Sequence, residues 1–483
     1  MSKKPGIAKL RAMLDKKEIS ACELAGEYIK RIKAADKKIN SYITVCESEA
    51  MAAAERAQKL IASGGAQPLT GIPVSVKDNI CTKNIKTTCA SRMLEDFVPI
   101  YDATAVKKLN GAGAVILGKT NMDEFAMGGS SQTSYYGGVK NPYDISRVPG
   151  GSSGGAAAAA AAGFCAAAIG SDTGGSVRQP ASFCGVTGLK PTYGAVSRWG
   201  LIAFASSLDQ IGVIAGSAED AGIVLDCICG KDENDATSSD KAKGGCTAKT
   251  GSDISGIRIG IPKEFFGSGI DDEVRAAVMG AADYYKSLGC EIRECSIPSL
   301  EYAVSSYYLI SSAEAASNLS RFDGIKFGHR SGFGEDFNEL ISNSRREGFG
   351  DEVKRRIMLG NYALCSGYYD DYYKKATCIR TKIISEYKAV FDDCDVVITP
   401  TAPETAYKIG ERENDPVKMY LADICTVTAN IAGLPAISTT CGYDKNNMPI
   451  GMSITGRAFD EQTIIAVCDR FERDFTRTEA DLK

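Results

Sequence analysis

VPGGSSGGAAAAAAAGFCAAAIGSDTGGSVRQPA, residues 148–181, is the most informative stretch of this chain of 483 residues. It holds two runs rich in glycine and serine, PGGSSGG at 149–155 and GSDTGGSVRQP at 170–180. Alanine dominates the segment between them and predicts a helix over residues 154–162. A helix with such small side chains is expected where it lies very close to other backbone, so we expect it to be buried.

A lysine and two serines are the candidate catalytic residues. Lys77 lies in the segment GIPVSVKDN (71–79), in which the alternation of Val74 and Val76 predicts a strand that ends at Lys77 and could carry its amine inward. Ser152 and Ser176 lie in the two glycine-rich runs. A lone lysine at a strand end is usually solvated, and serines among glycines are usually turn residues, so only the combination indicates a catalytic site.

The chemistry of a serine nucleophile sets a requirement on Lys77. A serine hydroxyl is a weak nucleophile and needs a base, and the one histidine, His329, lies in a polar stretch with no acidic motif beside it. An exposed lysine with a pKa of about 10.4 is charged at neutral pH. Lys77 must therefore be buried, because lowering its pKa by about three units corresponds to roughly 4 kcal/mol, which desolvation can supply. Ser152 would relay the proton between Lys77 and Ser176.

The run before Ser176 favours an oxyanion hole. Its backbone carries few side chains and can turn several N–H groups toward one point. We expect the donors to be the backbone amides of Thr173, Gly174, Gly175 and Ser176.

Two other motif matches are misleading. Residues 113–120 (GAVILGKT) satisfy the pattern of a phosphate-binding loop, but their middle residues are Ala, Val, Ile and Leu, which are typical of a buried strand. Residues 150–154 (GGSSG) satisfy the GxSxG pattern, with Ser152 as nucleophile and His329 as base. That motif needs a strand immediately before the serine, and residues 141–149 are rich in turn formers.

Composition excludes several classes of protein. The net charge of -4 leaves no basic excess for binding nucleic acid, so a partner should hold any RNA. The 17 cysteines are scattered and include no CxxC pair, and the N-terminus lacks the pattern of a signal peptide, which together indicate reduced thiols in the cytoplasm. The longest apolar run, 156–169, is mostly alanine and too short to span a membrane. We expect neither a metal site nor a membrane anchor.

The periodicity predicts one α/β domain over residues 1–483. Residues 1–64 are expected to be helical, with Ser20 and Glu23 forming a capping box. Residues 65–300 and 393–483 are expected to form the α/β core, including a βαβ unit over 257–296 and a polar surface loop over 230–256. Residues 301–392 are expected to be a largely helical insertion, with helical periodicity over 302–321 and 352–391.

The stretch 148–181 resembles the serine- and glycine-rich signature of the amidase signature family. The resemblance implies a large central mixed and twisted β-sheet between layers of α-helices. It also implies a catalytic triad of a lysine, a serine preceded by a cis peptide bond and a nucleophilic serine. These roles fall on Lys77, Ser152 and Ser176.

Further segments resemble the glutaminase subunits of tRNA-dependent amidotransferases: NMDEFAMGG (121–129), KPTYGAVSRWGLIAFASS (190–207), SNLSRFDG (317–324), VKRRIMLG (353–360) and TPTAP (399–403). In those subunits an arginine, an aspartate and a tyrosine hold glutamine, which by motif correspond to Arg356, Asp423 and Tyr307. The adjacent Tyr308 could instead face the pocket. Free glutamine is a zwitterion, so a guanidinium for its carboxylate and a carboxylate for its ammonium are chemically sensible.

The resemblance also implies a division of labour in a complex of three different chains. This chain forms a γ-glutamyl ester on Ser176 and releases ammonia, and it needs no cofactor of its own. The complex is completed by a tRNA-binding kinase subunit, which uses ATP and Mg²⁺, and by a small third subunit. It amidates Glu-tRNA(Gln), Asp-tRNA(Asn) or both. Two alternatives stay open: a free-standing amidase of the same family acting on a small or acyl amide, and a non-catalytic scaffold within such a complex.

Overall fold

The computed structural model describes residues 5–412 and 416–480. The first residues of the chain, for which no signal peptide is expected, lie outside these ranges. The first and last residues of the predicted domain, 1 and 483, also lie outside them. The helices are α1 (Ile7–Asp15), α2 (Ala21–Ile39), α3 (Glu47–Ala62), α4 (Thr104–Gly111), α5 (Gly154–Ala162), α6 (Arg178–Phe183), α7 (Ala218–Ile228), α8 (Asp272–Ser287), α9 (Leu300–Asn318), α10 (Phe337–Gly348), α11 (Asp351–Leu364), α12 (Lys375–Asp393), α13 (Pro416–Leu421), α14 (Val427–Ile431) and α15 (Glu461–Asp474).

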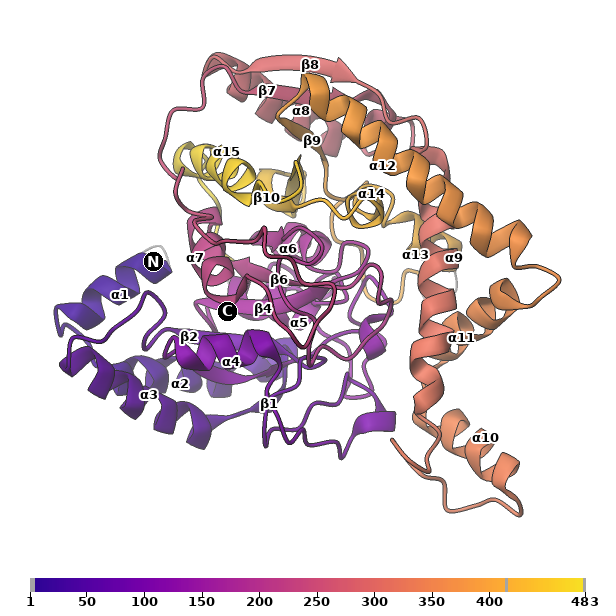
Figure 1. Ribbon diagram of the computed structural model, residues 1–483. Helices are drawn as coiled ribbons and strands as arrows, with labels where there is room; N and C mark the ends of the chain where they lie inside the picture. Colours follow the sequence, from indigo (N-terminus) through magenta and orange to yellow (C-terminus); the bar gives the residue numbers. More distant parts are fainter. Residues whose placement is uncertain (1–4, 413–415, 481–483) are drawn as a thin grey trace.

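A single sheet of 11 strands runs through the described part of the molecule (Figure 1). Its order is β1-β3-β2-β4-β6-β5-β10-β11-β9-β7-β8, and it is mixed, because β2 pairs parallel with β3 and β4 whereas β6, β5, β10 and β11 follow one another antiparallel. The predicted fold class is therefore confirmed. The strands are β1 (Tyr42–Val45), β2 (Pro73–Lys77), β3 (Val115–Thr120), β4 (Ala167–Asp172), β5 (Thr187–Lys190), β6 (Gln210–Ala215), β7 (Arg258–Pro262), β8 (Glu291–Cys295), β9 (Val396–Pro400), β10 (Ala436–Tyr443) and β11 (Pro449–Gly456).

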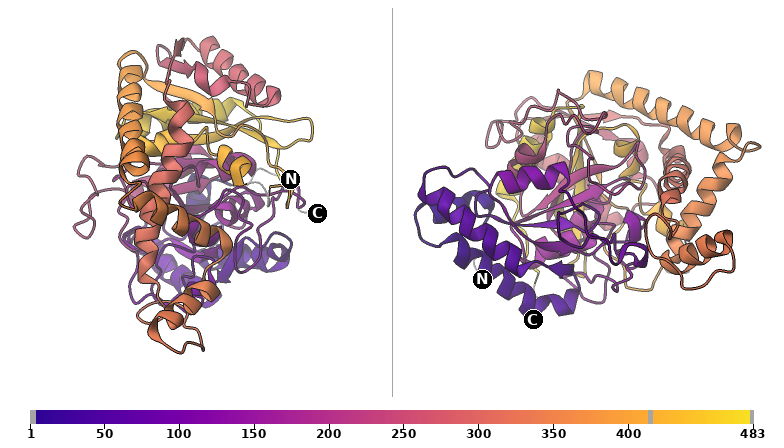
Figure 2. Two further views of the ribbon diagram at one scale, coloured as in Figure 1. Left: turned by 90° about the vertical axis from the view of Figure 1, so that its right-hand side faces the viewer. Right: turned by 60° about the horizontal axis from the view of Figure 1, so that its bottom comes forward.

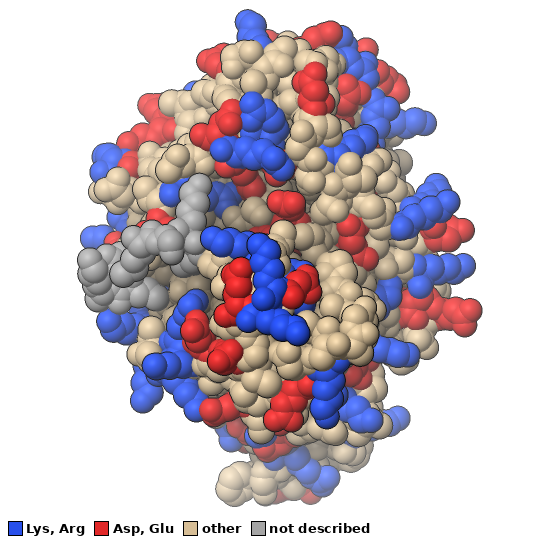
Figure 3. All heavy atoms as spheres, turned by 90° about the vertical axis from the view of Figure 1, so that its left-hand side faces the viewer, with Lys and Arg blue, Asp and Glu red and all other residues tan. Residues whose placement is uncertain are grey.

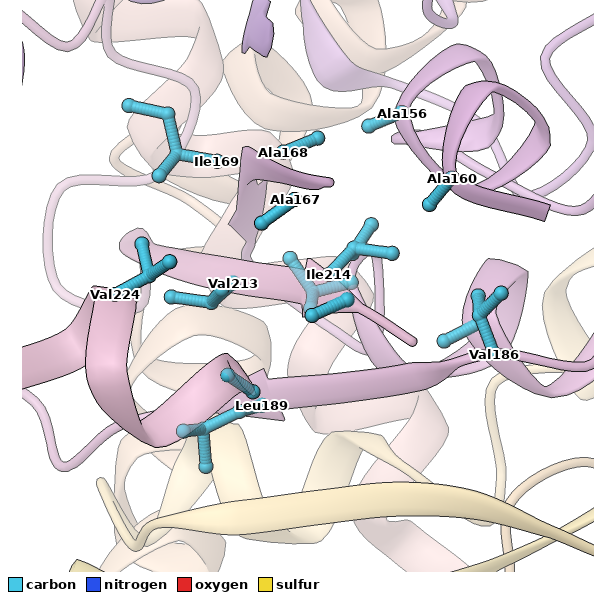
Figure 4. Close-up of a cluster of buried hydrophobic side chains, with 14 of the residues drawn as sticks. Ala156, Ala160, Ala167, Ala168, Ile169, Val186, Leu189, Val213, Ile214 and Val224 are labelled. Atoms are coloured by element: carbon cyan, nitrogen blue, oxygen red, sulfur yellow. The ribbon is translucent and has the colours of Figure 1, made fainter. Parts of the chain in front are cut away.

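Buried hydrophobic side chains of α5, β4, β5 and β6 belong to one core cluster. Figure 4 shows small side chains of α5 and β4 meeting the branched side chains of β6 and β5. Residues 154–161 of α5 are all buried, as predicted. A Cβ built on Gly155 would lie 2.3 Å from the backbone oxygen of Asn121, so only a helix of small residues fits here.

The N-terminal segment differs from its prediction in one element. The capping box at Ser20 and Glu23 forms and α2 follows it, but residues 42–45 are a strand, β1, and pair antiparallel with β3. The segment YITV is rich in aromatic and β-branched residues, which favour a strand at the sheet edge over a helix.

Helices α9–α12 lie together along one side of the sheet (Figures 1 and 2). The helical pattern predicted over 352–391 is correct in type but wrong in continuity, because α11 ends at Leu364 and helical backbone resumes at Asp370, where a π-helical segment (Asp370–Lys374) runs directly into α12. Residue Cys365, at the end of α11, has extended backbone (ψ 140°), and the chain turns there before it enters α12. None of the helices described in residues 5–412 and 416–480 is long and apolar enough to cross a membrane.

Candidate active site

Ser176 lies in a tight turn between β4 and α6. Its side chain is 8% exposed, and its Oγ makes no hydrogen bond to any described residue. Gly175 immediately before it has φ +137°, and a Cβ there would lie 2.3 Å from the hydroxyl oxygen of Thr426. The turn therefore requires glycine at this position, and it leaves the serine hydroxyl free to react.

Asp172 holds this turn in place from the end of β4. Its carboxylate accepts hydrogen bonds from the N–H groups of Gly175 (2.8 Å) and Val177 (3.1 Å), which flank the serine. Burial disfavours the charged carboxylate, but the bidentate pair with Arg178 (3.0 and 3.1 Å) and a hydrogen bond from Asn430 outweigh it and hold the pKa of Asp172 well below its usual range. Asp172 is thus an ionised anchor for the nucleophile turn, a role the sequence analysis missed.

Lys77 ends β2 and is completely buried, as its proposed role requires. Its Nζ lies 2.7 Å from Ser152 Oγ, 2.8 Å from Ser153 Oγ and 2.9 Å from Ser171 Oγ. Desolvation lowers the pKa of Lys77 to about 7, against the weaker opposing fields of Asp123, Asp172 and Asp209. Three hydroxyls thus surround the amine. A pKa of about 7 means that about half of the molecules carry a neutral amine at pH 7.

Ser152 connects the lysine to the turn that carries Ser176. The Gly151–Ser152 peptide bond is cis, as the family resemblance implied. The next residue, Ser153, donates its N–H to the backbone oxygen of Ser176 at 3.0 Å, and Gly151 donates its N–H to the side chain of Gln179. These hydrogen bonds join the two glycine-rich runs, and Ser152 is bonded to Lys77, whereas no hydrogen bond joins the side chains of Ser152 and Ser176 within the described residues.

Of the four backbone N–H groups expected to form the oxyanion hole, one is already used in a hydrogen bond within the turn. Gly175 uses its N–H for Asp172, which leaves Thr173, Gly174 and Ser176 as the proposed oxyanion donors. The hydroxyl of Thr173 donates to the carboxylate of Asp209 at 2.6 Å, which fixes the start of the turn.

The residues predicted to bind substrate meet around two tyrosines of α9. Tyr307 packs against the nucleophile turn, because a Cβ on Gly174 would lie 2.5 Å from its ring. Tyr308 donates its hydroxyl to Asp423 at 2.6 Å, and the guanidinium carbon of Arg356 lies 4.4 Å from the centre of its ring. Tyr307 therefore contacts the turn that carries Ser176, and Tyr308 contacts both Arg356 and Asp423.

Glu352 and Tyr420 support Arg356 and were also missed. Glu352 Oε1 accepts from Arg356 Nε at 2.6 Å and from the Tyr420 hydroxyl at 3.1 Å. The ring of Tyr420 stacks on Tyr308 with centres 4.0 Å apart. Burial raises the pKa of Asp423 to about 6, although the hydrogen bond from Tyr308 opposes this shift. The spacing of Glu352 and Arg356 by four residues along a helix was the only sequence signal for this arrangement.

The structure excludes a phosphate-binding loop at residues 113–120 and a GxSxG motif at residues 150–154 with His329 as its base. Residues 115–120 form β3, and Lys119 is buried, donating to the backbone oxygen of Ile80 and to the hydroxyl of Thr87 instead of facing an open phosphate site. His329 pairs with Glu347 at 2.9 Å, and Ser152 is bonded to Lys77. Within the described residues, no three His, Cys, Asp or Glu side chains are grouped so as to hold a metal ion.

Comparisons with known proteins agree with this geometry. A family model described as Amidase matches residues 23–465. The A subunit of the glutamyl-tRNA(Gln) amidotransferase of Ruminiclostridium cellulolyticum is 56% identical over 471 residues, 97% of this chain and 97% of that protein. The crystal structure of the same subunit from Thermotoga maritima has a TM-score of 0.81 at 41% identity, covering 96% of this chain and 95% of that one. The native peptide amidase of Stenotrophomonas maltophilia has a TM-score of 0.84 at 28% identity and 99% coverage of both chains. The chain belongs to the amidase family, which confirms the resemblance inferred from residues 148–181.

Proposed function

We propose that this chain is the glutamine-hydrolysing subunit of a tRNA-dependent amidotransferase. The observation that carries the proposal is the charged pair beside the nucleophile turn: Arg356 and Asp423 both contact Tyr308, while the neighbouring Tyr307 packs on Gly174. A guanidinium and a carboxylate suit the two charges of a free amino acid, and an enzyme for uncharged amides needs neither. Relatives that are 56% and 50% identical carry the name of the A subunit of glutamyl-tRNA(Gln) amidotransferase.

In the proposed reaction, neutral Lys77 draws a proton from Ser152 as Ser152 accepts the proton of Ser176. The Ser176 oxygen attacks the side-chain amide carbon of glutamine, and the N–H groups of Thr173, Gly174 and Ser176 stabilise the oxyanion. The proton returns through Ser152 to the departing nitrogen, which leaves as ammonia. Water then attacks the γ-glutamyl ester by the same proton route and releases glutamate.

The ammonia serves partner subunits in this proposal. The complex contains a tRNA-binding subunit that activates the tRNA-bound acid with ATP and Mg²⁺, together with a small third subunit. The chain has a net charge of -4, and acidic and basic side chains are interspersed on the face shown in Figure 3, which supports tRNA binding by a partner. None of the 17 cysteines, all of which lie within the described residues, forms a disulfide, which supports a reducing compartment such as the cytoplasm.

Substrate competition tests the proposal against a free-standing amidase. We would compare L-glutamine with butyramide, which has the reacting amide but neither charge, in the unmodified chain and in Arg356→Ala. Glutamine should be strongly preferred, and Arg356→Ala should reduce kcat/KM for glutamine by about 10- to 100-fold, the value of a charged hydrogen bond. Intact glutamine turnover in Arg356→Ala would favour the free-standing amidase. An unchanged reaction in Ser176→Ala would instead favour a scaffold.

A further inference from the structure

Glu124 is a buried carboxylate that takes no part in the proposed reaction. It lies in the segment 121–129, which follows β3, and its side chain is enclosed by the protein. Burial raises the pKa of Glu124 to about 7, although hydrogen bonds from Ser91 and from the N–H of Gly350 oppose this shift. Because a buried carboxylate is costly unless other groups hold it, its partners indicate what it does.

The partners of Glu124 lie at the start of α11. Its Oε2 accepts the N–H of Gly350, the residue that precedes this helix, at 2.9 Å. Its Oε1 accepts from the hydroxyl of Ser91, which also lies 3.2 Å from the backbone oxygen of Gly348. Glycine has no side chain with which to cap its own helix. A carboxylate from a distant part of the chain therefore satisfies the N–H group at this helix terminus, where negative charge is also favourable.

The contact between this segment and the start of α11 is close. A Cβ built on Gly350 would lie 2.3 Å from Glu124 Oε2, so glycine is required here. The ring of the next residue, Phe125, packs edge-on against Phe349 with centres 5.5 Å apart and lies 5.3 Å from the ring of Phe322. Two consecutive residues thus hold the two residues that lead into α11.

The same segment also contacts the loop that carries Ser152. Asp123 accepts the N–H of Ser131 at 2.8 Å, and a Cβ on Gly151 would lie 2.1 Å from its carboxylate. The hydroxyl of Ser131 lies 3.4 Å from the backbone oxygen of Ser152. Residues 123–125 therefore connect the loop of the proposed proton relay to the start of α11.

The start of α11 determines where the substrate arginine lies. Arg356 is six residues beyond Gly350, which is about 9 Å along the helix axis. Glu352, in the first turn of α11, accepts a hydrogen bond from Arg356 Nε at 2.6 Å. A shift of the helix start would therefore move Arg356 and Glu352 together relative to Ser176.

We infer that Glu124 is a positioning residue for glutamine: it holds the N-terminus of α11 so that Arg356 lies at the distance from Ser176 that the substrate requires. This inference rests on the proposed function, in which Arg356 binds the α-carboxylate of glutamine. Glu124 acts through the position of α11 and contacts neither the substrate nor the reacting atoms.

The test is a double-mutant cycle in glutamine hydrolysis at pH 8, where Glu124 is mostly ionised. Glu124→Ala should raise KM about 10-fold and change kcat by less than about threefold, because the reacting groups keep their places. In the Arg356→Ala background, Glu124→Ala should cause no further loss of kcat/KM, because it acts through that side chain. Glu124→Gln, like the protonated carboxyl group, keeps an acceptor for the N–H of Gly350 and should leave KM within about threefold of normal.

Asp220 provides a matched control. It is also a buried carboxylate that accepts an N–H at the start of a helix, from Ile7 of α1 at 2.7 Å, and a Cβ on Gly6 would lie 2.9 Å from it. Asp220→Ala should leave KM for glutamine unchanged, because α1 carries none of the proposed site residues. Glu124→Asp is a second variant that keeps the charge but is one methylene too short to reach Gly350, so it should raise KM as Glu124→Ala does.

Every other result overturns either the role of Glu124 or the function on which it rests. A normal KM in Glu124→Asp, an equal loss of kcat/KM with and without Arg356, or a fall in kcat alone would overturn the positioning role. An equal rise of KM in Asp220→Ala would show general destabilisation and would overturn it as well. Intact glutamine turnover in Arg356→Ala would overturn the proposed function and the inference together.

Discussion

The protonation of Lys77 predicts how glutamine hydrolysis depends on pH. With a pKa of about 7, half of the lysine is neutral at pH 7, whereas a lysine at 10.5 would be neutral in only about 0.03% of molecules. Burial therefore increases the amount of active base about 1,500-fold at neutral pH. Because the neutral amine is the active form, kcat/KM should rise with pH through about 7 and level off above pH 8 to 9.

The carboxyl group of Asp423 makes kcat/KM fall more steeply as the pH decreases. Asp423 must be ionised to hold the substrate ammonium, and its pKa of about 6 means that it becomes neutral as the pH falls further. From Lys77 alone, kcat/KM at pH 5 should be about 100-fold below its plateau, and protonation of Asp423 lowers it further. The variant Asp423→Asn should have a lower plateau of kcat/KM. Below that plateau, its kcat/KM should depend on pH only through the protonation of Lys77.

The assay is initial-rate ammonia release between pH 5 and 9.5, with acylation followed separately in single turnovers. A value of kcat/KM that does not change between pH 6 and 8, or that rises only around pH 10, would refute a buried neutral lysine as the base. Lys77→Arg supplies a charge that is never lost, so it should slow acylation at least about 1,000-fold at every pH. Acylation near the normal rate in that variant would contradict the mechanism independently.

Three further predictions concern single residues. Ser152→Ala should slow acylation by at least about 100-fold without unfolding the chain, as measured in single turnovers, because it removes the proton relay. Glu352→Gln loosens Arg356 and should raise KM for glutamine about 10-fold with little change in kcat; a fall in kcat alone would contradict a binding role. Gly360→Ala should destabilise the fold by about 2 kcal/mol in urea unfolding, because its Cβ meets the backbone of α9. Gly280→Ala in α8, which meets no atom within 4 Å, should instead be neutral or stabilising by up to about 1 kcal/mol.

Strong local patterns made much of the fold predictable. The alanine helix α5, the capped start of α2 and the parallel pair β7 and β8 around α8 all follow from periodicity and small-residue composition. The break between α11 and α12 was missed, because tyrosines and lysines fit a helical period whether or not the helix continues. The strand β1 was missed because four residues carry too short a pattern, and its pairing with β3 decides its structure.

The candidate catalytic residues were easier to single out from the sequence than the residues that contact them. Ser152 and Ser176 lie in glycine-rich runs, and Lys77 ends a strand with alternating valines, so each stands in a recognisable local pattern. Asp172 was not recognised as an anchor, because its partners Arg178 and Asn430 converge only in three dimensions. Tyr308, Tyr420 and Glu352 likewise make their contacts only because α9, α13 and α11 pack together, which no local pattern encodes.

The central claim is that Ser176 is acylated by glutamine, and covalent trapping tests it most directly. The purified chain would be exposed to a reactive γ-glutamyl analogue or to a reactive apolar acyl analogue, followed by intact-mass measurement and peptide mapping. We predict one glutamyl adduct on the peptide that contains Ser176, absent in Ser176→Ala. Labelling of another residue, or labelling by the apolar reagent alone, would contradict it.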